Sequence, residues 1–282
     1  MSVYVCVSVC THTCAILLLI CCSHWGRFKK KNLTLKALKG KLKEKSGFQG
    51  LGVTCSQCTC KVNLQTLKVR MLLFCVCRTG TVTVTDQYQY PDTLKGDIDA
   101  FAREPFVVRF IMLCLHRSFQ MQDFVLIPLH TSPNNTTKEL DAVVDVFNDI
   151  RKKWKTENVI FLGDFNADCG YLAKKNRKNV RLITDPAFIW LINDKNDTTV
   201  RKSTDCAYDR IVVHGEKVAR AIVPLSAKPF NFKKEFRLSE DQALEVSDHY
   251  PVEVLLKASA SRQQQVSLTT SSAKCNKNNK RQ

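Results

Sequence analysis

The stretch Asn158-Val-Ile-Phe-Leu-Gly-Asp-Phe-Asn166 decides the fold class, because an apolar strand in it runs directly into polar residues. Residues 158–163 form a predicted strand that ends at Asp164. Two apolar runs, Phe106–Leu115 and Phe124–His130, precede this stretch, and we expect them to be adjacent buried strands.

A helix is predicted between Phe124–His130 and the strand that ends at Asp164. Thr136-Thr-Lys-Glu139 is a capping-box pattern, which typically begins a helix. The apolar residues after it share one helical face: Leu140, Val143, Val144, Phe147, Ile150 and Trp154. Further strands are expected over Cys206–Val213 and Tyr250–Lys257. This alternation predicts a layered α/β domain with polar residues at its strand ends.

Those polar residues suggest a chemistry. They are His130, Gly163-Asp-Phe-Asn166, Tyr208-Asp-Arg210 and Ser247-Asp-His249. If they converge at one sheet edge, two imidazoles, three carboxylates and an amide suit metal-assisted phosphodiester hydrolysis. Three of these motifs also have a structural alternative, since His130 could be a packed core histidine and the motifs at Asp164 and Asp248 could be simple turns.

Composition narrows the class of protein. The chain has 282 residues, of which 44% are hydrophobic and 24% charged, so a fully disordered or fibrous protein is excluded. The net charge of +17 favours a polyanionic partner, whether nucleic acid, anionic membrane or an acidic protein.

The N-terminal region differs from the rest of the chain. Ten of the 14 cysteines lie in residues 1–77, whereas a disulfide scaffold spreads them throughout. The apolar stretch Val3–Cys22 fits a signal peptide, a membrane anchor or a segment without a targeting role. The Val-Cys alternation of residues 3–10 is also what a translated GTGTGT repeat would spell, so an alternative 5′ exon is a further explanation.

Three other segments carry features that suit binding. Residues 27–45 hold nine basic residues and one acid at amphipathic spacing, which suits anionic lipid, DNA or a solvated surface. Cys55-Ser-Gln-Cys58 is a lone CxxC, either a metal knuckle or incidental thiols. Ala258–Gln282 is predicted to be a disordered basic tail that contacts DNA phosphates or anionic lipid surfaces.

Several of these motifs together resemble the deoxyribonuclease I family. They are Arg103–Phe106, Leu126–His130, Phe161–Ala167, Asp197–Thr199, Cys206–Arg210 and Val246–His249. The basic tail and the spelling after Asp197 look most like the gamma branch of that family, and the similarity covers about residues 70–257. The resemblance implies a four-layer α/β sandwich of the endonuclease/exonuclease/phosphatase type. It also implies a monomeric Ca²⁺- and Mg²⁺-dependent (or Mn²⁺-dependent) endonuclease that leaves 5′-phosphate ends on DNA.

The resemblance also assigns catalytic roles. His130 and His249 match the general acid and base pair, and Asp209 matches the carboxylate that orients His249. Asp164 and Asn166 match the phosphate and metal site. Which histidine is the acid stays open at this stage.

Further roles follow from the same resemblance. Asp248 matches a second carboxylate near the Mg²⁺, and Arg103 matches a phosphate contact. The remaining matches are a Ca²⁺ site at Asp197, Thr199 and Thr204, and a disulfide between Cys169 and Cys206.

The N-terminal region departs from the family pattern. We find no match to the family's first-strand Asn, to its metal-binding Glu, or to the Glu that pairs with the first histidine. The expected organisation is therefore an atypical leader at 1–78, a nuclease domain at 79–257 that is incomplete at its N-terminus, and a tail at 258–282.

Two functions remain open on this basis. One is a DNA endonuclease whose activity is reduced by the altered N-terminal region. The other is a catalytically dead basic module that binds DNA or anionic lipid. A disulfide would persist in the secretory pathway or outside the cell, which is the expected location, and the basic tail makes the nucleus the alternative.

Overall fold

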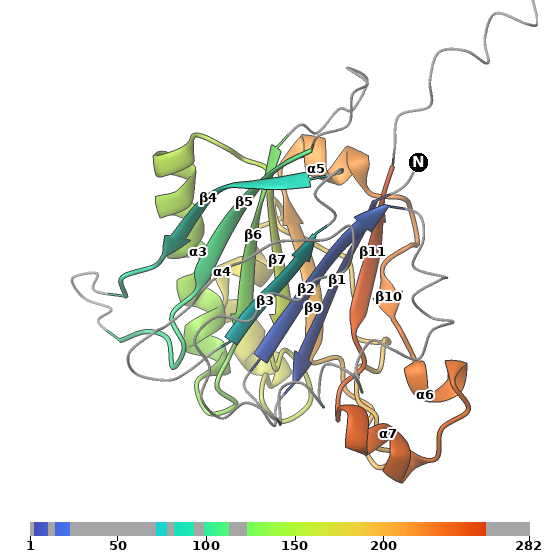
Figure 1. Ribbon diagram of the computed structural model, residues 1–282. Helices are drawn as coiled ribbons and strands as arrows, with labels where there is room; N and C mark the ends of the chain where they lie inside the picture. Colours follow the sequence, from blue (N-terminus) through green and yellow to red (C-terminus); the bar gives the residue numbers. More distant parts are fainter. Residues whose placement is uncertain are drawn as a thin grey trace, which may run out of the picture.

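The computed structural model describes residues 82–92, 99–112 and 123–257, together with the backbone of three strands nearer the N-terminus. Two β-sheets lie face to face, with helices outside one of them (Figure 1). Residues 27–45, the CxxC of residues 55–58 and the tail at 258–282 lie outside the described residues.

The first sheet has six strands in the order β4-β5-β6-β7-β9-β8. Their bounds are β4 Val82–Gln89, β5 Phe106–Met112, β6 Asp123–His130, β7 Val159–Asp164, β8 Ile189–Trp190 and β9 Asp209–His214. β6 and β7 are parallel, and the other pairs are antiparallel. The adjacent strands predicted over 106–115 and 124–130 are confirmed, because β5 pairs with β6.

The second sheet has five strands in the order β10-β11-β1-β2-β3. Their bounds are β1 Val3–Cys10, β2 Ala15–Cys22, β3 Leu72–Cys77, β10 Lys228–Pro229 and β11 Val252–Leu256. β11 pairs with β1, so this sheet takes strands from both sides of residue 78 (Figure 1). The apolar Val3–Cys22 stretch therefore supplies two sheet strands, which we did not predict from its hydropathy.

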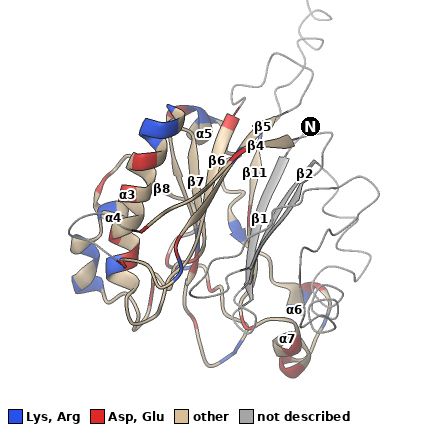
Figure 2. Ribbon diagram, turned by 60° about the vertical axis from the view of Figure 1, so that its left-hand side comes forward, with Lys and Arg blue, Asp and Glu red and all other residues tan. Residues whose placement is uncertain are grey.

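The described residues also form several helices. They are α3 Thr136–Trp154, the 3₁₀ helix η1 Lys174–Asn179, α4 Arg181–Thr184, α5 Glu216–Ala221, α6 Phe232–Glu235 and α7 Glu240–Val246. α3 connects the parallel strands β6 and β7, and it carries acidic and basic residues along its length (Figure 2). No helix among the described residues is long and apolar enough to cross a membrane.

Two apolar clusters hold these layers together. One lies between the sheets, where Leu126, Ile160 and Ile211 of the first sheet meet Val252 and Val254 of β11. The other lies between the first sheet and α3, whose predicted apolar face is buried as expected, with Trp154 partly buried at its end. The described residues thus build three of the four layers of the predicted α/β sandwich.

The predicted capping box at the start of α3 does not form. The helix begins at Thr136, but the N-cap residue is Asn135 and its side chain accepts no capping hydrogen bond. The carboxylate of Glu139 instead accepts a hydrogen bond of 3.0 Å from the backbone N–H of Ser132. The prediction was wrong because Glu139 binds the chain segment that follows β6 and not its own N-cap.

Candidate active site

Three adjacent strands bring polar side chains to one edge of the first sheet. In the strand register, His130 of β6 is opposite Asp164 of β7, and Asp164 is opposite Asp209 of β9. The expected convergence of strand-end residues is therefore present in the structure. All three side chains are buried, with exposed fractions of 6%, 2% and 0%.

Gly163 allows β6 and β7 to lie close together just before this edge of the sheet. Gly163 has a φ of +138°, and a Cβ there would lie 2.0 Å from the carbonyl oxygen of Leu129. A side chain at this position would push β7 away from β6. The glycine therefore fixes the placement of the next residue, Asp164.

His249 reaches the same edge from the other sheet, just before β11. Its Nδ1 lies 2.8 Å from Oδ2 of Asp209 and 3.8 Å from Oδ2 of Asp164. One ligand atom from each of these three residues lies within 4.8 Å of the others. The second oxygen of Asp209, Oδ1, is buried, and no described residue hydrogen-bonds to it.

The carboxylate oxygens of this group fit a divalent cation, whereas the imidazole of His249 bonds Asp209 through Nδ1. Carboxylate oxygens are the ligands that Mg²⁺ and Mn²⁺ prefer, and an unpartnered buried carboxylate oxygen is costly unless something positive lies near it. Among the described residues, Asp164, Asp209 and His249 form the one group of this kind that could hold a metal ion.

The two histidines have opposite electrostatic environments. Burial lowers the pKa of His249, but the carboxylates of Asp209 and Asp164 outweigh burial and raise that pKa to about 10. Burial also lowers the pKa of His130, and here the positive charges of Arg103 and His249 add to the decrease, so that the raising effect of Asp164 does not outweigh it. Burial raises the pKa of Asp164, and the neighbouring Asp209 carboxylate raises it further. At neutral pH, His249 is therefore the charged histidine and His130 the neutral one.

His130 is only partly oriented by its neighbours. Its Nε2 lies 3.5 Å from Oδ2 of Asp164, but its Nδ1 is buried without a hydrogen-bond partner among the described residues. A histidine that exchanges protons usually has its other nitrogen fixed by a carboxylate or carbonyl. The sequence has no match to the family's glutamate that pairs with the first histidine, and the unpartnered Nδ1 of His130 agrees with that absence.

Asn166 lies where predicted, next to Asp164. Its φ of +48° places it in the left-handed region, and its backbone N–H donates to Oδ1 of Asp164 at 3.0 Å. Its side-chain amide donates to the backbone carbonyl of Thr131 at 3.0 Å. Thr131, which we did not predict, is fully buried and donates its hydroxyl to the carbonyl of Phe165. It thereby ties the end of β6 to the turn that carries Asn166.

Arg103 and Asp248 both lie close to the histidines. The guanidinium of Arg103 donates from Nη1 to the carbonyl oxygen of His130 at 3.1 Å. The charge of Asp248 raises the pKa values of both His130 and His249, although burial is the larger influence on each. The structure therefore brings together the predicted catalytic and phosphate-contacting residues, including these two.

A second residue that the sequence did not reveal holds β9 in place. Thr198 is fully buried, and its hydroxyl accepts hydrogen bonds from the backbone N–H groups of Tyr208 and Asp209 at 3.0 and 3.1 Å. The same hydroxyl donates to the carbonyl of Cys206. A Thr within the Asp197–Thr199 motif was visible in the sequence, but nothing there indicated its contact with Asp209.

The predicted calcium-site residues also lie together. Oδ1 of Asp197 accepts hydrogen bonds from the backbone N–H and the hydroxyl of Thr199, at 2.9 and 2.6 Å. The hydroxyl of Thr204 lies 2.8 Å from that of Thr199. Carboxylate and hydroxyl oxygens are hard donors of the kind that Ca²⁺ accepts.

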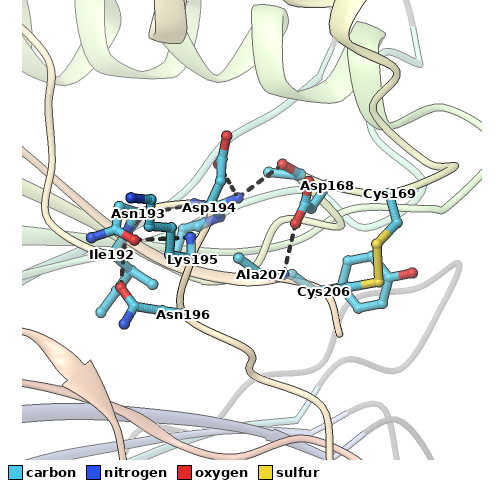
Figure 3. Close-up of polar contacts among 12 residues, drawn as sticks. Asp168, Cys169, Ile192, Asn193, Asp194, Lys195, Asn196, Cys206 and Ala207 are labelled. Carbon is cyan, nitrogen blue, oxygen red and sulfur yellow. Dashed lines mark hydrogen bonds and ion pairs between the residues drawn. A yellow bond between two sulfur atoms is a disulfide. The ribbon is translucent and has the colours of Figure 1, made fainter. Parts of the chain in front are cut away.

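The predicted disulfide is present. Cys169 and Cys206 are bonded, and the carboxylate of Asp168 accepts a hydrogen bond of 2.9 Å from the backbone N–H of Ala207 beside the bridge (Figure 3). The bridge therefore joins the turn after β7 to the segment that leads into β9, which carries Asp209.

The comparisons with known proteins agree with the fold. Residues 71–249 match the Endonuclease/Exonuclease/phosphatase family, and the chain belongs to that family. It is 54% identical to mouse deoxyribonuclease gamma over 179 residues, which covers 63% of this chain and 56% of that one. It is 47% identical to pig deoxyribonuclease-1 over 194 residues, which covers 68% and 66% of the two chains.

The extent of these matches is limited. The chain spans little more than half the length of deoxyribonuclease gamma, and residues 1–70 lie outside the family match. Among solved structures, one of D. rerio TDP2 is 15% identical, with a TM-score of 0.44 and coverage of 65% of this chain and 71% of that one.

Proposed function

We propose that the protein is a divalent-metal-dependent endonuclease that hydrolyses DNA phosphodiester bonds and leaves 5′-phosphate ends. The observation that carries this proposal is the buried group of Asp164, Asp209 and His249, with His130 on the adjacent strand end. The relatives, which are named deoxyribonucleases, support DNA as the substrate. We propose that the protein acts as a monomer.

The two histidines supply the proton transfers. The bond from Nδ1 of His249 to Asp209 leaves Nε2 as the nitrogen that exchanges a proton with water or substrate. His130, whose Nε2 faces Asp164, is the second such group. One imidazole takes a proton from the attacking water, and the other gives a proton to the leaving oxygen. This pairing suits in-line attack at phosphorus, which needs a base and an acid on opposite sides.

The phosphate is held between these groups. We propose that Asp164, Asn166 and Asp248 hold a Mg²⁺ or Mn²⁺ ion, with Asp209 close to it. When bound, such an ion offsets negative charge on the non-bridging oxygens. Arg103 contacts the phosphate. Its guanidinium hydrogen-bonds the backbone carbonyl of His130, which places its positive charge next to this catalytic histidine. Asp197, Thr199 and Thr204 hold a structural Ca²⁺ ion.

A second candidate function is supported by one observation. Because Nδ1 of His130 has no partner among the described residues, that imidazole is oriented only through the contact of its Nε2 with Asp164. A chain with slow chemistry and a net charge of +17 would still bind DNA, or anionic lipid through residues 258–282. The alternative is therefore a basic binding module with little catalysis.

A plasmid assay tests the proposal. Supercoiled DNA incubated with Mg²⁺ and Ca²⁺ is nicked if the protein is an endonuclease, and a ligase reseals the nicks only if they carry 5′-phosphates. His249→Ala abolishes nicking but not DNA binding, whereas Leu225→Ala, which alters an exposed side chain, leaves both unchanged. DNA retention without nicking supports the binding module. Cleavage that survives chelation of metals, or the loss of His249, contradicts the proposed mechanism.

We also propose that the protein resides in the secretory pathway or outside the cell, with the nucleus as the alternative. The Cys169–Cys206 bridge supports this location, because such bonds persist in oxidising compartments. Alkylation of native protein followed by mass spectrometry checks it. Free thiols at both positions would favour the nucleus.

A further inference from the structure

Two overlapping acceptor sequences for N-linked glycans lie in the turn before α3. They are Asn134-Asn135-Thr136 and Asn135-Thr136-Thr137, and both have the form Asn-X-Thr in which X is not proline. A sequence this short also occurs by chance. The exposure and the hydrogen bonds of its residues therefore decide whether the folded chain can carry a glycan there.

The turn is open to solvent and its backbone is held. Pro133, Asn134 and Asn135 are all exposed. The N–H of Asn135 donates to the carbonyl of Ser132, and the carbonyl of Asn135 accepts from the N–H of Glu139, both at 2.9 Å. A glycan is a bulky, hydrated group that needs a surface position. The turn provides such a position without enclosing the side chain of Asn135.

The fold does not use the side chain of Asn135 as a helix cap. Asn135 is the N-cap residue of α3, a position where Asn usually accepts a hydrogen bond from an N–H group of the first turn. Here the side chain accepts no such bond. A glycan on its amide nitrogen would therefore cost α3 no capping hydrogen bond.

The threonine hydroxyls favour the second of the two sequences. Thr136, which completes the first, is 1% exposed, and its hydroxyl donates to the carbonyls of Ser132 and Pro133 at 3.2 and 3.4 Å. These partners are only three and four residues away, so the contacts form as soon as the turn does. Thr137, which completes the second sequence, is partly exposed. The acceptor sequence of Asn135 is therefore the accessible one.

The third acceptor sequence among the described residues, Asn196-Asp197-Thr198, has the opposite surroundings. Thr198 is fully buried, and its hydroxyl accepts hydrogen bonds from two backbone N–H groups at the start of β9. Asn196 is partly buried, and its Oδ1 accepts from the N–H of Asn193 at 3.2 Å. The fold uses both polar side chains here, whereas at Asn135 it uses neither.

We propose that Asn135 carries an N-linked oligosaccharide. The inference rests on the proposed secretory location, where the donor, a lipid-linked oligosaccharyl diphosphate, is present. Nδ2 of Asn135 bonds to the anomeric carbon of the donor as the bond from that carbon to the diphosphate oxygen breaks. The lipid diphosphate leaves with the electron pair, and the amide gives up one proton. The glycan then covers the exposed start of α3.

Site mapping of the secreted protein tests the proposal. The full chain is produced in cultured animal cells and treated with peptide N-glycosidase in heavy-oxygen water, which converts a glycosylated Asn to a labelled Asp. Mass spectrometry should find the label at residue 135 in the majority of molecules. Asn135→Gln and Thr137→Ala should each lose one glycan, seen as faster migration on a gel. Thr137→Ser, which keeps the hydroxyl, and Asn134→Gln should retain it.

The outcomes separate the glycan from the proposed location. Asn135→Gln should still be secreted with its disulfide formed, because the side chain caps nothing, so loss of the glycan is not a sign of misfolding. Secreted wild-type protein with an intact Cys169–Cys206 bridge and no label at Asn135 would mean that the glycan is wrong while the location stands. A label at Asn134 in its place would overturn the choice of residue. Protein retained in the nucleus with free thiols and no glycan would overturn both.

Discussion

At the scale of single residues, the site shows how environment separates two residues of one type. His130 and His249 both belong to strand-end motifs, and the sequence alone did not distinguish their roles. The structure gives His249 a carboxylate at 2.8 Å and leaves Nδ1 of His130 without a partner among the described residues. A pairing of this kind depends on chain segments far apart in the sequence, since Asp209 and His249 are 40 residues apart.

A buried carboxyl near the site gives a prediction about pH. The side chain of Glu139 is fully buried, and burial raises its pKa to about 7, against the hydrogen bond from Ser132. The folded protein therefore keeps this proton at pH values where the unfolded chain has lost it. The stability that protonated Glu139 contributes is complete below about pH 4.5 and is lost as pH rises through 7. The loss is on the order of 3 kcal/mol by about pH 8.

Urea unfolding at pH 5, 6, 7 and 8 measures this effect. Glu139→Gln cannot ionise, so its free energy of unfolding should fall less than that of the wild type over this range. Glu216→Gln, which changes an exposed carboxyl, should keep the wild-type slope. An unchanged slope in the Glu139 variant would mean that this carboxyl is ionised in the folded protein at every pH tested.

At the scale of elements, periodicity predicted the long and buried segments. The run over 158–163 became β7, the apolar face of residues 140–154 became the buried face of α3, and 250–257 contains β11. β8 and β10 were not predicted, since each has two residues and carries no period. β4, an edge strand, was not predicted, because the Thr-Val alternation at its start resembles the translated repeat of residues 3–10.

The end of β7 gives a second prediction. Gly163→Ala should lower the free energy of unfolding by about 1–3 kcal/mol or more, because its Cβ would overlap the carbonyl of Leu129. Gly170→Ala is the matched control, since no heavy atom lies within 4 Å of the place that its added methyl group would take, and a change within about 0.5 kcal/mol is expected. Urea unfolding of both variants checks this, and equal stability of the two would refute the steric account.

At the scale of the whole molecule, the site is assembled across both sheets. Asp164 and Asp209 belong to the first sheet, whereas His249 lies three residues before β11, a strand of the second. A small apolar cluster that includes Val200, Phe232 and Tyr250, the residue after His249, joins residues of α6 and α7. The sequence motifs identified Asp164, Asp209 and His249 as candidate site residues. Only the packing of the two sheets explains why they converge.

The disulfide should stabilise this assembly. The bridge closes a loop over a sequence separation of 37 residues, and the loop-entropy relation gives about 4 kcal/mol for a loop of that length. The double variant Cys169→Ser with Cys206→Ser should therefore lose about 2–4 kcal/mol of unfolding free energy. Chemical denaturation of both proteins, without reductant, measures the loss. A double variant as stable as the wild type would mean that the bridge adds no net stability.

The last prediction concerns catalysis by the whole chain. His130 lacks a partner on Nδ1 among the described residues, so the chain should nick plasmid DNA only weakly with Mg²⁺ and Ca²⁺. Replacing residues 1–78 with the corresponding segment of mouse deoxyribonuclease gamma should supply the missing carboxylates and raise nicking by a factor on the order of 10² or more.

Two controls make this test decisive. His130→Ala in the grafted chain should return nicking to the level of the ungrafted chain, because the graft acts through that imidazole. The same substitution in the ungrafted chain should change little. If the ungrafted chain already cleaves as fast as the graft, then His130 is oriented by a group outside the described residues. If the graft folds, binds DNA and still does not cleave, then the orientation of His130 is not what limits catalysis.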